Sequence, residues 1–137
     1  MRSSLGLPLV VLAAFALHGC MAPGQLACPP GQQRLRTAQL FFGRSAAGPA
    51  ASPAAFRKFV DEELTPRFPD GLTVLDGGAQ WRGPENRLIR ESAKVVLIVL
   101  PAHGDATQRI AAAQAAYKAR FRQDAVLVVT QPACVAF

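Results

Sequence analysis

The sequence predicts an α+β domain of the ferredoxin-like kind, and three observations lead to that prediction. Two segments carry apolar residues at three- and four-residue steps, as amphipathic helices do. Four short runs rich in Val, Leu, Ile and Phe read as strands. The segments follow one another in the order βαββαβ, which is typical of a four-stranded antiparallel sheet in spatial order 4-1-3-2 with two helices on one face.

The first half of the pattern begins with an aromatic strand over residues 36–44, bounded by a loop rich in Ser, Ala, Gly and Pro. Ser52 and Pro53 then have the character of a helix cap and of the proline that suits a first helical turn. The buried stripe of this helix consists of Phe56, Phe59, Val60 and Leu64. Pro66 ends the helix.

The central hairpin is predicted from residues 72 to 100. Its first strand covers residues 72–82 and is interrupted at Gly77 and Gly78, where we expect a β-bulge. A loop over residues 83–86 leads into a long strand over residues 87–100. The second half of that strand is apolar on both faces, which indicates a central position in the sheet.

The last two elements are a helix and a short strand. Asp105 and Gln108 resemble a capping box at the start of the helix. The expected buried stripe of the helix is Ile110, Ala113, Tyr117 and Phe121. Residues 125–130 form the final strand.

The N-terminus predicts export. A charged start is followed by an apolar stretch from Leu5 to Leu17, which as a helix would reach roughly 20 Å and therefore fall short of a bilayer core of about 30 Å. The tetrapeptide Leu17-His18-Gly19-Cys20 resembles the lipobox of bacterial lipoproteins, in which the cysteine carries thioether-linked lipid and an acyl chain such as palmitate. An ordinary signal peptide with an incidental Cys20 is the alternative.

We therefore expect residues 1–19 to be a signal peptide, residues 20–33 a flexible tether and residues 34–137 a single α+β domain. The expected location is the bacterial cell envelope, on the periplasmic or outer-membrane side, with the lipid on Cys20 as the contact with the membrane. Removal of Arg2 leaves 14 basic residues against 9 acidic ones. Export excludes nucleic acid as a partner and leaves anionic lipids or envelope polymers, or simply a solvated basic surface.

Two further cysteines, Cys28 and Cys134, predict one disulfide in an oxidising compartment. The expected topology places the start of the first strand and the end of the fourth at one end of the sheet, so it brings both cysteines together. A bridge that closes about 105 residues is worth roughly 4 to 5 kcal/mol in the chain-entropy model.

No catalytic residue, metal ligand set or cofactor motif is recognisable. After removal of the signal peptide His103 is the one histidine, and the sequence offers it no triad or metal partners. Asp76-Gly77-Gly78 has neither the spacing nor the following helix of a phosphate loop.

The candidate ligand or interface residues cluster in the central hairpin, and they are Asp76, Trp81, Arg82, Arg90, Glu91 and Lys94. Period-two alternation puts Glu91 in one row with apolar residues, so we expect it to pair with an arginine rather than to act as a catalytic acid. Trp81 is more typical of a packing residue than of a ligand platform.

Several segments resemble a bacterial lipoprotein family catalogued as domain of unknown function 3574. They are the run from Thr65 to Asp76 (TPRFPDGLTVLD), Gln80-Trp81-Arg82, the run from Ile89 to Val95, Ala116-Tyr117-Lys118 and the ending Cys134-Val135-Ala136-Phe137. The resemblance implies the envelope location and the fold over about residues 36–137, and it implies no catalytic residues.

Three functions follow from these observations. The favoured one is a non-enzymatic envelope lipoprotein whose domain self-associates or binds a partner, because nucleophile, metal and cofactor motifs are missing. The second is a small-molecule enzyme or binder of the dimeric α+β barrel kind, in which two sheets enclose a cavity. The third is a polyanion-binding surface that uses Arg67, Arg82, Arg90 and Lys94.

A homodimer through the helix-free sheet face is also predicted. Strands one, three and four carry apolar residues on both faces, whereas the wet face of a lone antiparallel sheet is normally polar. We expect Arg90 or Lys94 at the rim of that face. The alternatives to a dimer are that the tether or the C-terminal tail folds over this face, or that the face lines a ligand cavity.

Overall fold

The computed structural model describes residues 27–43 and 51–137. The predicted signal peptide, the lipidation residue Cys20 and most of the predicted tether lie outside the described residues. What the sequence indicates for residues 1–26 therefore remains a prediction.

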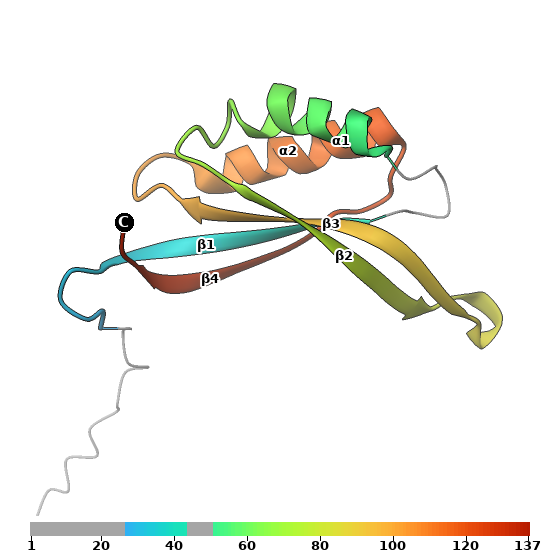
Figure 1. Ribbon diagram of the computed structural model, residues 1–137, viewed down its shortest axis with the longest axis horizontal. Coiled ribbons are helices and arrows are strands. Elements are labelled where there is room, and N and C mark those ends of the chain that lie inside the picture. Colours follow the sequence, from blue (N-terminus) through green and yellow to red (C-terminus); the bar gives the residue numbers. More distant parts are fainter. Residues whose placement is uncertain (1–26, 44–50) are drawn as a thin grey trace, which may run out of the picture.

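The described chain forms one four-stranded antiparallel sheet covered by helices on one face (Figure 1). Its elements are β1 (Gln33–Phe42), α1 (Pro53–Phe59), η1 (Val60–Leu64), β2 (Thr73–Arg82), η2 (Pro84–Asn86), β3 (Leu88–Leu100), α2 (Ala106–Phe121) and β4 (Leu127–Val135). The strand order β2-β3-β1-β4 is the predicted 4-1-3-2 order read from the opposite edge. The βαββαβ prediction is confirmed.

Both helix starts have the caps that the sequence indicates. The Ser52 hydroxyl accepts a hydrogen bond from the amide of Ala55 at 3.1 Å. The Asp105 carboxylate accepts one from the amide of Gln108 at 2.8 Å. Each contact satisfies an amide that the first helical turn leaves without a partner.

The first helix does not stay α-helical to its end. It continues from α1 into η1, a π-helical turn in which the amide of Thr65 donates to the carbonyl of Val60 at 2.9 Å. The wider turn still places Leu64 in the core, as the sequence pattern predicts.

An aromatic cluster fills the space between the helices and the sheet. The ring of Phe42 on β1 lies 4.6 Å from that of Tyr117 on α2 and 5.5 Å from that of Phe56 on α1, measured between centroids. Phe59 lies 5.3 Å from Tyr117. Edge-on and tilted pairs of this kind add about 0.5–1.5 kcal/mol each beyond the area they bury.

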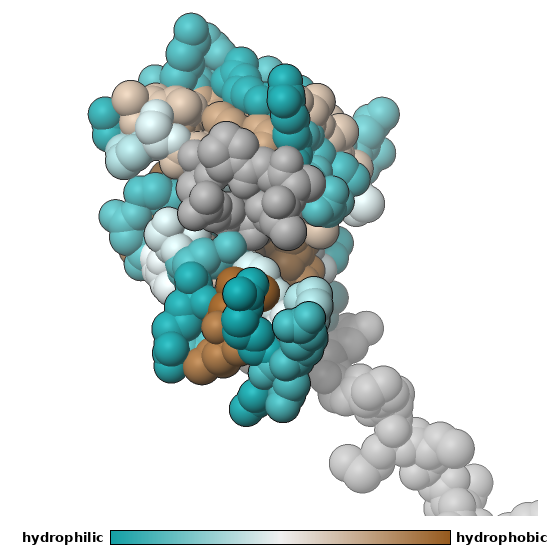
Figure 2. Space-filling model, turned by 90° about the vertical axis from the view of Figure 1, so that its right-hand side faces the viewer, coloured by the Kyte–Doolittle hydropathy of each residue, from teal (hydrophilic) through white to brown (hydrophobic). Residues whose placement is uncertain are grey.

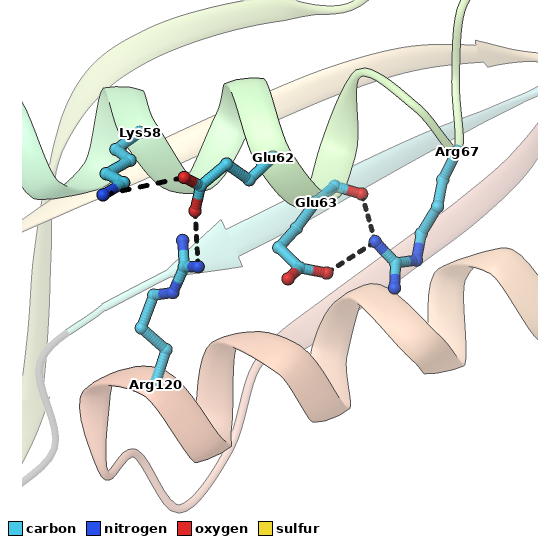
Figure 3. A network of polar contacts seen from close by, with 5 residues as sticks. All are labelled: Lys58, Glu62, Glu63, Arg67 and Arg120. Atoms are coloured by element: carbon cyan, nitrogen blue, oxygen red, sulfur yellow. Dashed lines mark hydrogen bonds and ion pairs between the residues drawn. The ribbon is translucent and has the colours of Figure 1, made fainter.

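One ion pair joins the first helix to α2, and two further pairs link residues four positions apart along the first helix and the turn that follows it (Figure 3). Glu62 of η1 accepts a hydrogen bond from Arg120 of α2 at 2.6 Å and lies 3.7 Å from Lys58. The hydrogen bond from Arg120 is the main reason that the pKa of Glu62 lies below its usual value. Arg67 is held by Glu63, four residues earlier, at 2.7 Å.

The predicted bulge at Gly77 and Gly78 is wrong. β2 and β3 pair residue for residue through this stretch, with Gly77 opposite Ala93 and Gly78 opposite Ser92. Since the pairs on either side are in phase, no extra residue is present in this part of β2.

The fourth strand is longer than predicted. It runs to Val135 and includes Pro132, which lies opposite Arg36. A proline is tolerated there because β4 is an edge strand.

The disulfide prediction is confirmed in the structure. Cys28 and Cys134 are bonded, their Cα atoms are 5.4 Å apart, and 106 positions separate them in the sequence. Cys134 is opposite Arg34 on β1, so the bridge fastens the segment before β1 to the end of β4.

Candidate functional site

The sheet face turned away from the helices, which we call the open face, is apolar over most of its extent. Register and alternation assign it Leu35, Thr37, Gln39 and Phe41 of β1, Leu75, Ala79 and Trp81 of β2, Ile89, Glu91, Ala93, Val95, Leu97 and Val99 of β3, and Leu127, Val129 and Gln131 of β4. Several large side chains are well exposed there, including Leu127 at 62% and Leu75 at 46%. Glu91 is the one ionisable side chain among these strand residues.

A hollow of about 770 Å³ lies on the open face between β1 and β3, and we call it the open-face hollow. Its floor includes Leu35, Thr37 and Gln39 of β1 together with Leu97 and Val99 of β3. The loop before β2 and the C-terminal Phe137 flank it, and Asp70 in that loop is the one ionisable residue in its lining. Phe137 is 95% exposed, so it borders the hollow without filling it.

The six candidate residues of the hairpin do not form one site. Asp76, Arg82, Arg90 and Lys94 alternate with Trp81 and Glu91, so the first four point to the helix side of the sheet and the last two lie on the open face. The expectation that Arg90 or Lys94 rims the open face is therefore wrong.

The basic residues of the hairpin have close polar partners. The ammonium of Lys94 contacts the carboxylate of Asp76, its neighbour across the strands. The guanidinium of Arg90 donates to the side-chain oxygen of Gln80 at 2.8 Å. Arg82 donates to both the backbone and side-chain oxygens of Asn86 at 3.2 Å. These contacts hold the hairpin together.

A smaller cavity of about 220 Å³, the hairpin pocket, brings two of the candidates to the aromatic cluster. Asp76 and Lys94 line it together with Ser92, and Phe42, Phe56 and Tyr117 line it as well. The helical stripe in the sequence predicts Tyr117 as a core residue, but nothing in the sequence shows that it would line a cavity.

Tyr117 has a perturbed phenol. Its hydroxyl donates to the carbonyl of Gly43 at 3.3 Å, and the side chain is almost fully buried. Burial, with a second contribution from the negative charge of Glu91, raises the pKa of Tyr117 above its usual value. A Glu91 oxygen lies only 3.0 Å from the point where a Cβ on Gly43 would be, so that carboxylate and the phenol lie near the same end of β1. That Glu91 pairs with an arginine stays a prediction.

The hairpin end of the molecule also shows apolar surface. Figure 2 shows hydrophobic atoms between hydrophilic ones on the lower part of the molecule, where the hairpin lies. Trp81 and Leu88 are each 39% exposed in this region. The apolar character of the sheet therefore extends to the hairpin.

The residues proposed for polyanion binding are divided between two parts of the molecule. Arg67 follows η1 and is paired with Glu63, whereas Arg82, Arg90 and Lys94 belong to the hairpin. The geometry does not favour a polyanion-binding surface, because these four residues do not make one continuous basic patch.

Within residues 27–43 and 51–137, no group of three or more His, Cys, Asp and Glu side chains is arranged to hold a metal ion. His103 is exposed in the loop before α2. The same part of the chain contains no helix that is long and apolar enough to cross a membrane.

Two solved structures resemble this fold. One is a phage SAM lyase in complex with S-methyl-5'-thioadenosine, with a TM-score of 0.55 and 13% sequence identity over 85% of this chain and 96% of that one. The other is a phage SAM lyase in its apo state, with a TM-score of 0.54 and 14% identity over 83% of this chain and 97% of that one. No curated protein matches the sequence.

This likeness overturns the favoured interpretation of the sequence, a non-enzymatic domain that self-associates or binds a partner. That interpretation rested on the absence of recognisable catalytic motifs. The two similar structures are of an enzyme and share the fold over almost their whole length, so a chain of this shape without such motifs cannot be taken as non-enzymatic. At this identity the likeness establishes the fold alone.

The family assignment rests on the sequence itself. The segments that suggested the resemblance all lie within the range that matches a family model, residues 37–137. The match begins within β1 and covers every later element of the fold. The chain belongs to the family described as protein of unknown function (DUF3574).

Proposed function

We propose that this protein is a small-molecule enzyme or binder of the dimeric α+β barrel kind, in which two copies face each other across their open sheet faces. The observation that carries the proposal is the open-face hollow. Its volume of about 770 Å³ falls within the roughly 300–1,000 Å³ of small-molecule sites.

The exposed apolar residues of the open face support a second copy as the cover. Leu97, Val129 and Leu127 are 37%, 41% and 62% exposed, on a face that no helix of the described residues covers (Figure 1). Contiguous apolar surface of this kind marks interaction sites on proteins in water. A facing sheet would bury these side chains and enclose the hollow.

The lining of the hollow offers a ligand mostly uncharged polar groups and apolar walls. Gln33, Thr37 and Gln39 offer amide and hydroxyl groups, and Leu35 and Leu97 offer apolar walls. The structurally similar lyase is complexed with S-methyl-5'-thioadenosine, which makes this compound and SAM the first ligands to test.

The experiment compares arginine substitutions at two apolar residues of similar exposure. Leu97 is 37% exposed on the open face and Val74 is 39% exposed on the helix side. Calorimetric titration with S-methyl-5'-thioadenosine is expected to give saturable binding. Leu97→Arg should weaken it by about tenfold or more, because the new charge enters the hollow, whereas Val74→Arg should leave it unchanged.

A chromatographic assay for loss of SAM then distinguishes an enzyme from a binder. If neither compound binds nor reacts, the ligand proposal is wrong. If both variants behave alike, the hollow is not the site.

For the location of the protein in the cell, we propose that it is an envelope lipoprotein. Residues 1–19 are removed, Cys20 carries the lipid, and residues 20–33 are the tether. The order of charge, apolar stretch and small residues before Cys20 supports this proposal, and the Cys28–Cys134 disulfide suits an oxidising compartment. Intact-mass measurement of the membrane-extracted protein tests the cleavage and the lipid together.

A further inference from the structure

A third cavity lies on the helix side of the sheet, at the end where the tether joins the domain. We call it the tether-end cavity; its volume is about 650 Å³. Its lining consists of Arg34, Leu35 and Arg36 of β1, Leu100, Pro101 and Ala102 at the end of β3, Gly104, Asp105, Ala106 and Thr107 at the start of α2, and Pro132 of β4. Figure 1 shows the beginning of β1, the end of β3 and the start of α2 at the same end of the molecule.

Positive charge predominates in this lining. Arg34 and Arg36 are alternate residues of β1, so both side chains leave the same face of the strand. Arg36 donates to the hydroxyl of Thr130 on β4 at 2.9 Å, which holds its guanidinium beside the edge strand. Asp105 is the one acidic residue in the lining, and its carboxylate is engaged as the cap of α2.

Two guanidinium groups on one wall of a cavity suit a phosphate group. A guanidinium presents parallel N–H groups that match two oxygens of a phosphate, which a lysine ammonium cannot do. The walls at Leu35, Leu100 and Pro101 are apolar, so part of the lining could contact the carbon atoms next to that phosphate.

The position of the cavity indicates where such a phosphate would come from. Arg34 lies opposite Cys134, which is bonded to Cys28, and Cys28 comes only eight positions after Cys20. Eight extended residues span at most about 29 Å. A lipid on Cys20 would therefore keep this end of the domain within that distance of the membrane surface.

We propose that the tether-end cavity binds the phosphate of an anionic phospholipid headgroup and so orients the domain on its membrane. This inference uses the proposed lipid anchor but not the proposed small-molecule site. The open face lies on the other side of the sheet and stays available to a second copy.

The test uses the chain from residue 20 onward with Cys20→Ser, so that no lipid anchor contributes; every described element lies within it. Sedimentation with phosphatidylcholine vesicles that contain phosphatidylglycerol should show binding that is absent with phosphatidylcholine alone. The Arg34→Gln/Arg36→Gln variant should bind about thirtyfold more weakly, since each of the two basic residues near an anionic surface contributes about 1 kcal/mol.

The matched control is Arg82→Gln/Arg90→Gln, which removes the same charge from the hairpin and should bind as the parent chain does. Equal losses in both variants would mean general attraction by net charge and would overturn the proposal. Calorimetric binding of inorganic phosphate without binding to vesicles would make the ligand a soluble phosphate and overturn the lipid source. Arg34→Lys/Arg36→Lys keeps the charge and loses the parallel N–H groups of the guanidinium. If thermal melts show that this variant retains the parent fold, its affinity for the vesicles should lie between that of the parent chain and that of Arg34→Gln/Arg36→Gln.

Discussion

Single residues in this protein combine packing with polar chemistry, and Tyr117 is the clearest case. Its ring contacts Phe42, Phe56 and Phe59 in the aromatic cluster, while its hydroxyl reaches the carbonyl of Gly43. The helical stripe in the sequence predicts the first role, because spacing reports which face of a helix is buried. The second role depends on where β1 ends relative to α2, and that is a property of the tertiary structure.

Tyr117→Phe is expected to cost about 1 kcal/mol or less near neutral pH, because it removes one long hydrogen bond and keeps the ring. Above about pH 10 the variant should become more stable than the parent protein. The pKa of Tyr117 is raised in the folded state, so the unfolded chain loses this proton first and the parent protein loses stability as the pH rises. The phenylalanine variant has no such loss.

Urea unfolding of both proteins at about pH 8 and about pH 10.5 measures the difference. An equal loss of stability in the two proteins between these pH values would show that the phenol is not shifted.

The elements were largely predictable, and the exceptions have a physical cause. The caps at Ser52 and Asp105 are local signals, so the helix starts follow from a few neighbouring residues. The glycines of β2 mislead because a glycine pair indicates a bulge only when the partner strand is one residue shorter, and the register is set by both strands. The π turn of η1 has no side-chain cap and gives no local signal in the sequence.

The candidate site shows the same division. Alternation in β3 correctly separates Glu91 from Arg90 and Lys94, but it does not show which face forms a hollow. The open-face hollow lies at the other end of the sheet from the six hairpin residues, and it was missed because its lining carries almost no chemically distinctive side chain.

At the level of β2, Gly77→Ala is expected to stabilise the protein by about 0.5 kcal/mol, because alanine loses less chain entropy on folding. The new Cβ would lie 3.6 Å from Val95, an ordinary contact. Gly71→Ala is the opposite control, since φ there is +125° and an alanine would be strained. Denaturation midpoints of the two variants measure the expected gain and the expected loss of stability. A Gly77→Ala variant less stable than the parent would support the β-bulge after all.

At the scale of the whole molecule, the two faces of the sheet have different environments. Its helix side closes over a dry core that includes Leu40, Val96 and Ile98, whereas the open face has no cover among the described residues. Large apolar side chains on an uncovered face are costly in water. This imbalance is the physical reason for proposing a second copy.

Light scattering of the chain from residue 20 with Cys20→Ser should give the mass of a dimer at micromolar concentration. Leu127→Lys, which puts a charge at a side chain that is 62% exposed on the open face, should shift it to a monomer. Lys118→Leu, which changes an exposed residue of α2, is expected to leave the dimer intact. A parent chain that is monomeric throughout this range would exclude the pairing of sheets.

The strand order also governs how the protein can mature. In the proposed export β1 would be the first strand to leave a translocation pore, yet its two neighbours in the sheet are β3 and β4, the last strands in the chain. For a chain that crosses a membrane from its N-terminus, neither ladder of β1 can form until β3 has emerged, and the second must wait for Val135. If the chain is exported as proposed, its transport and its folding would be separated in time, because the sheet could be completed only after the last strand had crossed the membrane.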